Sequence, residues 1–195
     1  MNIARAIQPL LLATGLLLTG CAASPPSSLY VLDFPIEQEL AGIERGITVG
    51  VGPIELPQYL DRPQIVSRAS PNRLETSELH QWAEPLKAGV ARVLVVAIGR
   101  RLDTNRVYIV PRRIRTTMDY RVEIDIGRFD GAIGRGATLA ARWSLFRGEG
   151  AEPLLTKVSV IEEPAAGSDY PDLVAAQTRA AQRLGSEIAE AIAQR

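Results

Sequence analysis

Alternating apolar and polar residues predict a set of β-strands along much of the chain. The clearest is Tyr120–Ile126, where apolar residues at every second position predict one buried face and leave Arg121, Glu123 and Asp125 on the other. Similar patterns predict strands at Ser28–Phe34, Ile47–Val51, Gln64–Arg68, Arg73–Glu75, Thr138–Arg147 and Leu154–Ile161. The last two, with Tyr120–Ile126, are expected to form an antiparallel meander with glycine-rich turns.

The period of the apolar residues changes to a helical one in two segments. Between Trp82 and Leu102 they fall on a single stripe, and Pro85 suits a first helical turn. Asp169 and Pro171 open a second helix, which is expected to run to about Ala193. We therefore predict an α+β fold: one layered domain with a mixed, mostly antiparallel sheet of six or seven strands and two long amphipathic helices on one face.

Residues 1–20 have the charge and apolar pattern of a bacterial secretory signal. Arg5 is their only charged residue, and the apolar run Leu10–Leu18 leads to small residues and then to Cys21. Such a lipobox is cleaved before a cysteine that receives lipid. The run is too short to span a bilayer, which needs roughly 20 residues. The predicted lipid attachment residue is Cys21, and the predicted lipobox residues are Leu18, Thr19 and Gly20.

The predicted anchor determines where the folded part would lie. Residue 22 is Ala and not the Asp that retains lipoproteins in the inner membrane, so we expect the outer membrane, on its periplasmic side. Residues 21–28 form the lipidated cysteine and a short polar linker, which reaches about 25 Å at most. Residues 29–195 form the domain. The diacylglycerol and N-acyl chain on Cys21 are the only non-protein groups we expect, and no cofactor or metal.

Charge and chemistry exclude several classes of function. The chain has 22 basic and 22 acidic residues, and loss of Arg5 leaves a net charge of −1, so nucleic acid is not an expected partner. His80 is the only histidine and cannot form a zinc site alone, so we expect it at the entry to the first long helix. The segment Gly131–Gly136 joins two strands and is interpreted as a hairpin and not as a phosphate loop. Basic residues cluster at Arg106, Arg112, Arg113 and Arg115, where a solvated edge is the simpler interpretation. We predict a protein that is not an enzyme.

Two segments carry a resemblance to a known family. The first is Gly52–Val66, which contains Pro57-Gln58-Tyr59-Leu60-Asp61-Arg62-Pro63-Gln64-Ile65-Val66, and the second is Trp82-Ala83-Glu84-Pro85-Leu86. With Leu29–Leu32, Phe129-Asp130 and Trp143, they resemble the PqiC family of ABC-type transport auxiliary lipoproteins over almost the whole mature chain. The resemblance implies a partner with an MCE domain, in a system that carries phospholipids or other hydrophobic molecules between membranes. It implies no catalytic residues.

A candidate contact surface for that partner lies in the first segment. Two prolines reduce the cost of ordering it on binding, and Tyr and Arg are common at interface hot spots. The candidate interface residues are Pro57, Tyr59, Leu60, Asp61, Arg62 and Pro63. An alternative stays open, in which Tyr59 and Leu60 cover the sheet core and Asp61 and Arg62 form a local ion pair.

Other functions also stay open at this stage. An envelope lipoprotein enzyme acting on glycans or lipids is disfavoured by the single histidine and by the lack of a nucleophile motif. A structural lipoprotein that binds peptidoglycan, or only copies of itself as a homo-oligomer, fits the same composition.

Overall fold

A computed structural model of the chain describes residues 26–33, 46–111 and 117–195. The predicted signal peptide, its lipobox and Cys21 lie outside these residues, as do Arg112, Arg113 and Arg115. The strands are β1 Ser28–Tyr30, β2 Val49–Glu55, β3 Gln64–Ser70, β4 Arg73–Trp82, β5 Val107–Ile109, β6 Tyr120–Ala132, β7 Gly136–Arg147 and β8 Pro153–Pro164. The helices are η1 Gln58–Leu60, a single 3-10 turn, α2 Leu86–Leu102 and α3 Tyr170–Ala193.

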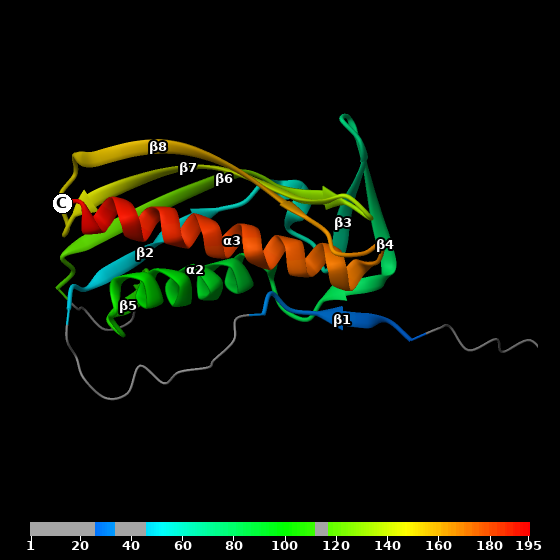
Figure 1. The fold of residues 1–195 in the computed structure, drawn as a ribbon, viewed down its shortest axis with the longest axis horizontal. Helices are drawn as coiled ribbons and strands as arrows, with labels where there is room; N and C mark the ends of the chain where they lie inside the picture. Colours follow the sequence, from blue (N-terminus) through cyan, green and yellow to red (C-terminus); the bar gives the residue numbers. More distant parts are fainter. Residues whose placement is uncertain (1–25, 34–45, 112–116) are drawn as a thin grey trace, which may run out of the picture.

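The larger of two sheets has five strands in the order β5-β2-β6-β7-β8. Strands β6, β7 and β8 pair in antiparallel fashion, which confirms the predicted meander, and the turn between β6 and β7 is the predicted hairpin. Strand β2 runs parallel to both β5 and β6, so the sheet is mixed. Helices α2 and α3 lie side by side across one face of this sheet (Figure 1). The predicted α+β class and the two helices on one face are confirmed.

The two helices begin and pack as their sequences dictate. The Asp169 side chain caps α3 by accepting a hydrogen bond from the Asp172 backbone N–H at 3.0 Å, and Pro171 occupies the first turn. A Cβ added at Gly185 would lie 2.6 Å from the Cβ of Ala97, so the glycine lets α3 approach α2 closely. The apolar stripe of α3 is buried throughout, at Leu173, Ala180, Leu184, Ile188 and Ile192.

The remaining strands form a second sheet of three strands, in the order β1-β4-β3. The eight strands of the described residues are thus divided between two sheets and do not form the single sheet of six or seven that the sequence suggested. The division arises because β3 and β4 pair with each other as a hairpin and β1 adds in parallel to β4. Figure 1 shows this smaller sheet at one end of the larger one, beyond the N-terminal end of α3.

The position expected for His80 is wrong. We expected this residue at the entry to the first long helix, but it lies within β4, opposite Ser28 of β1. Its Nδ1 is 2.7 Å from the hydroxyl oxygen of Tyr30, and its ring stacks on Tyr170 at 4.0 Å between centroids. His80 therefore joins the small sheet to the start of α3. Apolar periodicity did not reveal the strand position of His80, because β4 ends at Trp82, the residue where the helical pattern in the sequence begins.

The core between the large sheet and the helices is closely packed and mostly apolar. Its largest fully buried side chains include Trp143 and Phe129, from β7 and β6. The indole N–H of Trp143 donates to Ser159 Oγ at 3.0 Å, and Ser159 donates in turn to Glu187 at 2.7 Å. This chain of hydrogen bonds ties β7 and β8 to α3. In the described part of the chain, neither helix is long and apolar enough to cross a membrane.

Candidate functional site

The segment Pro57–Pro63 leaves β2 and makes one 3-10 turn before β3 begins. The Leu60 N–H donates to the carbonyl of Pro57 at 2.9 Å, and the Asp61 N–H donates to Gln58 at 3.1 Å. Leu60 is buried against the core, whereas Asp61 and the two residues after it are exposed. The turn therefore separates an inward half of the segment from an outward half.

The inward half is held by a buried carboxylate whose role sequence reasoning did not identify. The side chain of Asp130, on β6, is completely buried. It accepts a hydrogen bond from the Tyr59 hydroxyl at 2.8 Å and two from the Arg68 guanidinium, at 2.7 and 2.6 Å. Arg128 donates from Nε at 3.0 Å. One carboxylate thus connects η1, β3 and β6, and this contact fastens the small sheet to the outer face of the large one.

Electrostatics in this cluster follow from burial and hydrogen bonding. Burial alone would raise the pKa of Asp130, but the hydrogen bonds from Arg68, Tyr59 and Arg128 outweigh it and hold the pKa below its usual value. Burial, reinforced by the bond to Asp130, raises the pKa of Tyr59 to about 12. The carboxylate therefore stays charged and the phenol stays neutral across the physiological range.

The outward half of the segment meets the second motif segment. The Trp82 N–H donates to the carbonyl of Pro63 at 2.6 Å, which brings the end of β4 against the start of β3. Asp61, Arg62 and Pro63 line one side of a groove of about 340 Å³, and the segment Trp82–Leu86 lines the other. We call this the motif groove. Both parts of the sequence motif thus meet at one surface.

The structure agrees with the alternative interpretation for one half of the segment and disagrees with it for the other half. Tyr59 and Leu60 do pack inward, as the alternative stated. Within the described residues, however, Asp61 and Arg62 form no ion pair with each other. In the groove, Glu84 is paired with Arg92 of α2, and this hydrogen bond lowers the pKa of Glu84 despite partial burial. The exposed residues Asp61 and Arg62 are therefore the charged groups that the groove presents to a partner.

Two carboxylates of β6 lie on the outward face that strand alternation predicted. Glu123 and Asp125 point away from the helices on β6, and Glu123 is bonded by Arg121. No group of three or more potential metal ligands gathers in residues 26–33, 46–111 and 117–195.

The Asp130 cluster was missed because its members are far apart in sequence. Tyr59 is 71 residues from Asp130 and Arg68 is 62 residues away. A β-bulge between Ile126 and Arg128 also changes which residues of β6 face outward. The available signal was the presence of Phe129-Asp130 among the residues that carry the family resemblance, but nothing in the sequence connected Asp130 to Tyr59 or Arg68.

Comparison with known families decides what kind of protein this is. A family model described as ABC-type transport auxiliary lipoprotein component matches residues 30–189. The chain belongs to this family. The match includes both motif segments and Trp143, so the resemblance seen in the sequence is confirmed. Membership makes the protein a lipoprotein component that assists an ABC-type transport system.

Solved structures show the same fold at low sequence identity. One is the crystal structure of an uncharacterized protein, which is 16% identical with a TM-score of 0.70 and covers 86% of this chain and 99% of its own. Another is a Xanthomonas campestris protein of the DUF330 family, 18% identical with a TM-score of 0.67, covering 87% of this chain and 100% of its own. No curated protein matches the sequence.

Proposed function

We propose that this auxiliary lipoprotein is the outer-membrane subunit of an MCE-type intermembrane lipid transport system, where it docks the transport assembly and contributes to envelope integrity. In this role it acts as a binding protein and not as an enzyme. Its partner is the MCE-domain protein of the same system. Family membership supports the transport role, and the lipobox sequence ending at Cys21 supports the membrane anchor.

The short linker favours a docking role at the membrane surface. Seven residues, 22–28, follow the predicted lipid attachment residue Cys21, and β1 begins at Ser28. An extended chain of that length spans about 25 Å at most. The domain therefore stays beside its own membrane, and a partner anchored elsewhere has to reach across to it.

The observation that carries the docking proposal is the meeting of the two motif segments in the motif groove. Pro57 and Pro63 restrict the backbone on both sides of the turn, and the Asp130 cluster fixes Tyr59 from below. Exposed Asp61 and Arg62 then stand on a rigid support, so little conformational entropy is lost when a partner binds. A docking surface benefits from such preorganisation.

Capture of the MCE-domain protein tests this proposal. Arg62→Glu reverses the charge at the groove without disturbing the Asp130 cluster, and we expect capture by the purified lipoprotein to fall about tenfold or more. Arg142→Glu is the matched control, because Arg142 is an exposed arginine on β7, away from the groove. Capture by both variants at the wild-type level would contradict docking through the groove. Loss of capture by both would indicate general electrostatics.

The anchor is tested separately. Mass spectrometry of the mature protein is expected to find an acylated N-terminal Cys21, and membrane fractionation is expected to place it with outer-membrane markers. An unmodified, uncleaved N-terminus would contradict the anchor. Recovery with inner-membrane markers would contradict the sorting and leave the anchor standing.

A further inference from the structure

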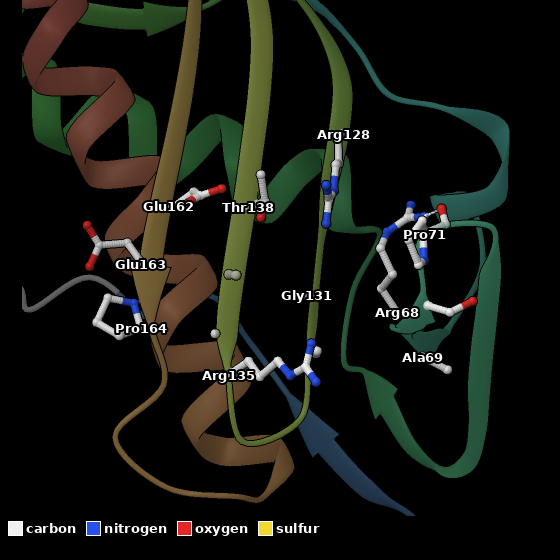
Figure 2. A pocket seen from close by; sticks show the side chains of 14 residues that line it. Arg68, Ala69, Pro71, Arg128, Gly131, Arg135, Thr138, Glu162, Glu163 and Pro164 are labelled. Carbon is white, nitrogen blue, oxygen red and sulfur yellow. Dashed lines mark hydrogen bonds between the residues drawn. The ribbon is translucent and has the colours of Figure 1, made fainter.

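A second hollow is lined by Arg68 and Arg128 of the Asp130 cluster. It has a volume of about 640 Å³ and lies between the outer face of the large sheet and the hairpin formed by β3 and β4. Arginines from β3, β6 and the turn after β6 line it, together with carboxylates from β8 (Figure 2). We call it the arginine cleft. None of its charged residues belongs to the segments that carry the family motif.

Arg128 presents a fixed guanidinium to this cleft. Its Nε is held by buried Asp130 at 3.0 Å, and about two fifths of its side chain is exposed (39%). Within the described part of the chain its two Nη groups have no hydrogen-bond partner, so their four N–H donors are free. An arginine that is anchored by Nε and free at both Nη atoms is preorganised to bind an oxyanion.

Arg135 adds a second cation from the β6–β7 turn. It is exposed, and among the described residues its guanidinium makes no hydrogen bond or ion pair. Figure 2 shows Arg128 and Arg135 extending toward Gly131 from opposite ends of the cleft, with Arg68 alongside. Arg68 already donates hydrogen bonds to Asp130 and to the carbonyl of Pro71, the latter at 2.7 Å. It therefore contributes positive charge to the cleft and few free hydrogen-bond donors.

The opposite wall carries a negative charge. Glu162 of β8 lies beside Thr138 of β7, which in turn lies beside Asp130 of β6. Neighbouring strands are about 5 Å apart, so the backbones of β6 and β8 are separated by roughly 10 Å. Figure 2 shows the Glu162 carboxylate directed toward Thr138, and thus over the sheet toward the arginines. Its carboxylate has no ion-pair partner among the described residues.

The neighbouring Glu163 contributes differently. Its carboxylate is bonded by Arg179 at 3.2 Å and by Arg183 at 2.8 Å, both from α3. Burial would raise the pKa of Glu163, but these two arginines hold it below its usual value. Glu163 is therefore neutralised from the helix side. Arg128 shares the carboxylate of Asp130 with Arg68, so the two arginines leave one excess positive charge there. Arg135 and Glu162 have no ion-pair partner among the described residues.

We propose that the arginine cleft binds a phosphate ester that carries a cationic amine, as in phosphoethanolamine. The phosphate oxygens accept hydrogen bonds from the Nη groups of Arg128 and from Arg135, and the ammonium group pairs with Glu162. Glu162 would repel a ligand that carries only a negative charge, and the two arginines would repel a ligand that carries only a positive charge. A ligand with both charges satisfies the two walls at once. This binding does not depend on the MCE partner or on the motif groove.

Calorimetric titration of the mature lipoprotein in dodecyl maltoside tests the proposal. The probes are O-phosphoethanolamine, inorganic phosphate and ethanolamine. We expect O-phosphoethanolamine to bind about tenfold tighter than either of the others, because only it makes both charged contacts. Equal binding of inorganic phosphate and O-phosphoethanolamine, or no binding of O-phosphoethanolamine, would overturn the proposal.

Substitutions on each wall test which part of the ligand that wall binds. Replacing both arginines, Arg128→Gln with Arg135→Gln, is expected to weaken O-phosphoethanolamine and inorganic phosphate alike by about tenfold or more. Glu162→Gln is expected to remove the preference for the amine and leave phosphate binding at least as strong. Arg142→Gln, on the same sheet face but outside the cleft, serves as control. Unchanged thermal unfolding shows that a variant is folded, and loss of the amine preference in the control alone would contradict the assignment.

A last comparison identifies the source of the headgroup. Dihexanoyl phosphatidylethanolamine, below its micelle concentration, carries the same headgroup on two short acyl chains. Tighter binding than O-phosphoethanolamine assigns the cleft to a lipid headgroup, and equal binding assigns it to a free phosphate ester. Either result supports the shared chemistry. Failure of these titrations leaves the capture experiment with Arg62→Glu unaffected, so the two proposals fail separately.

Discussion

The two ends of this molecule are stabilised in different ways. Large apolar side chains such as Trp143, Phe129 and Leu184 fill the space between the five-stranded sheet and the helices. The three-stranded sheet buries few such residues and is joined to the rest by polar contacts, at Asp130 and at His80. The first end is therefore sensitive to changes of volume, and the second to changes of charge and hydrogen bonding.

This contrast explains where the binding surfaces lie. The arginine cleft is lined by Arg68 and Arg128 of the Asp130 cluster. The motif groove begins at Asp61, two residues after Tyr59 of the same cluster. Buried charges are costly to place and weak as a source of stability, but they fix the direction of the groups bonded to them. The apolar end supplies the stability that this arrangement needs.

The largest loss of stability is expected from Trp143→Ala. The change empties the centre of the apolar end and removes the hydrogen bond to Ser159, so the free energy of unfolding should fall by about 3–5 kcal/mol. Denaturant titration measures it. Trp143→Phe keeps most of the volume and should cost about 1 kcal/mol. Similar losses for both variants would show that the hydrogen bond, and not packing, dominates.

Arg68→Ala tests the polar end. It leaves buried Asp130 without its two shortest bonds, and we expect the free energy of unfolding to fall by about 3 kcal/mol. The matched control is Arg73→Ala in the same hairpin, because the pair of Arg73 with Glu75 is exposed and contributes no more than about 1 kcal/mol. Equal costs for the two variants would contradict a structural role for the cluster.

Gly185→Val tests the close approach of the two helices. Its side chain would meet the Cβ of Ala97, so overpacking should lower the free energy of unfolding by about 2 kcal/mol. Ala175→Val places the same residue on the exposed face of α3 and should cost less than about 1 kcal/mol. Helix propensity alone would favour Gly185→Val slightly and disfavour Ala175→Val. A cost at position 185 no larger than that at position 175 would therefore contradict the close approach.

The smallest effect concerns the shape of the pH dependence. The pKa of Asp130 lies below its usual 3.8, so its contacts stabilise the fold above that pH and are lost as the pH falls through the folded value. The stability difference between the wild-type protein and Asp130→Asn should therefore be constant from pH 5 to 7, because this range begins about one unit above the usual pKa. It should shrink below pH 4. A difference independent of pH would show that the charge on Asp130 contributes nothing.

The sequence predicted the apolar end much better than the polar one. Helix α3 and the meander depend on local periodicity and on signals such as Asp169 and Pro171, and both were found. The bounds of α3 were nearly correct, whereas β6 was predicted only as far as Ile126 and continues to Ala132, past the β-bulge that interrupts its alternation. Strand β4 was predicted only as far as Glu75 and continues to Trp82, because its pairing with β1 is a contact between distant segments. Local pattern contains no information about such pairing.

The candidate site shows the same limit. Sequence motifs singled out Tyr59 and Arg62 together, but only the fold shows that Tyr59 bonds to buried Asp130 whereas Arg62 is exposed. Likewise, the Gly131–Gly136 turn was correctly interpreted as a hairpin, yet the charges gathered around its Arg135 come from β3, β6 and β8. Spatial clusters built from separate strands cannot be read from one segment.

Site-specific photo-crosslinking tests the central claim, docking through the motif groove, most directly. A photoreactive amino acid is placed at position 62 in the native lipoprotein in cells, with position 142 as the exposed comparison. The account predicts a crosslink from position 62 to the MCE-domain protein and none from position 142. Crosslinks from position 142 alone, or from neither position while the complex is intact, would contradict it.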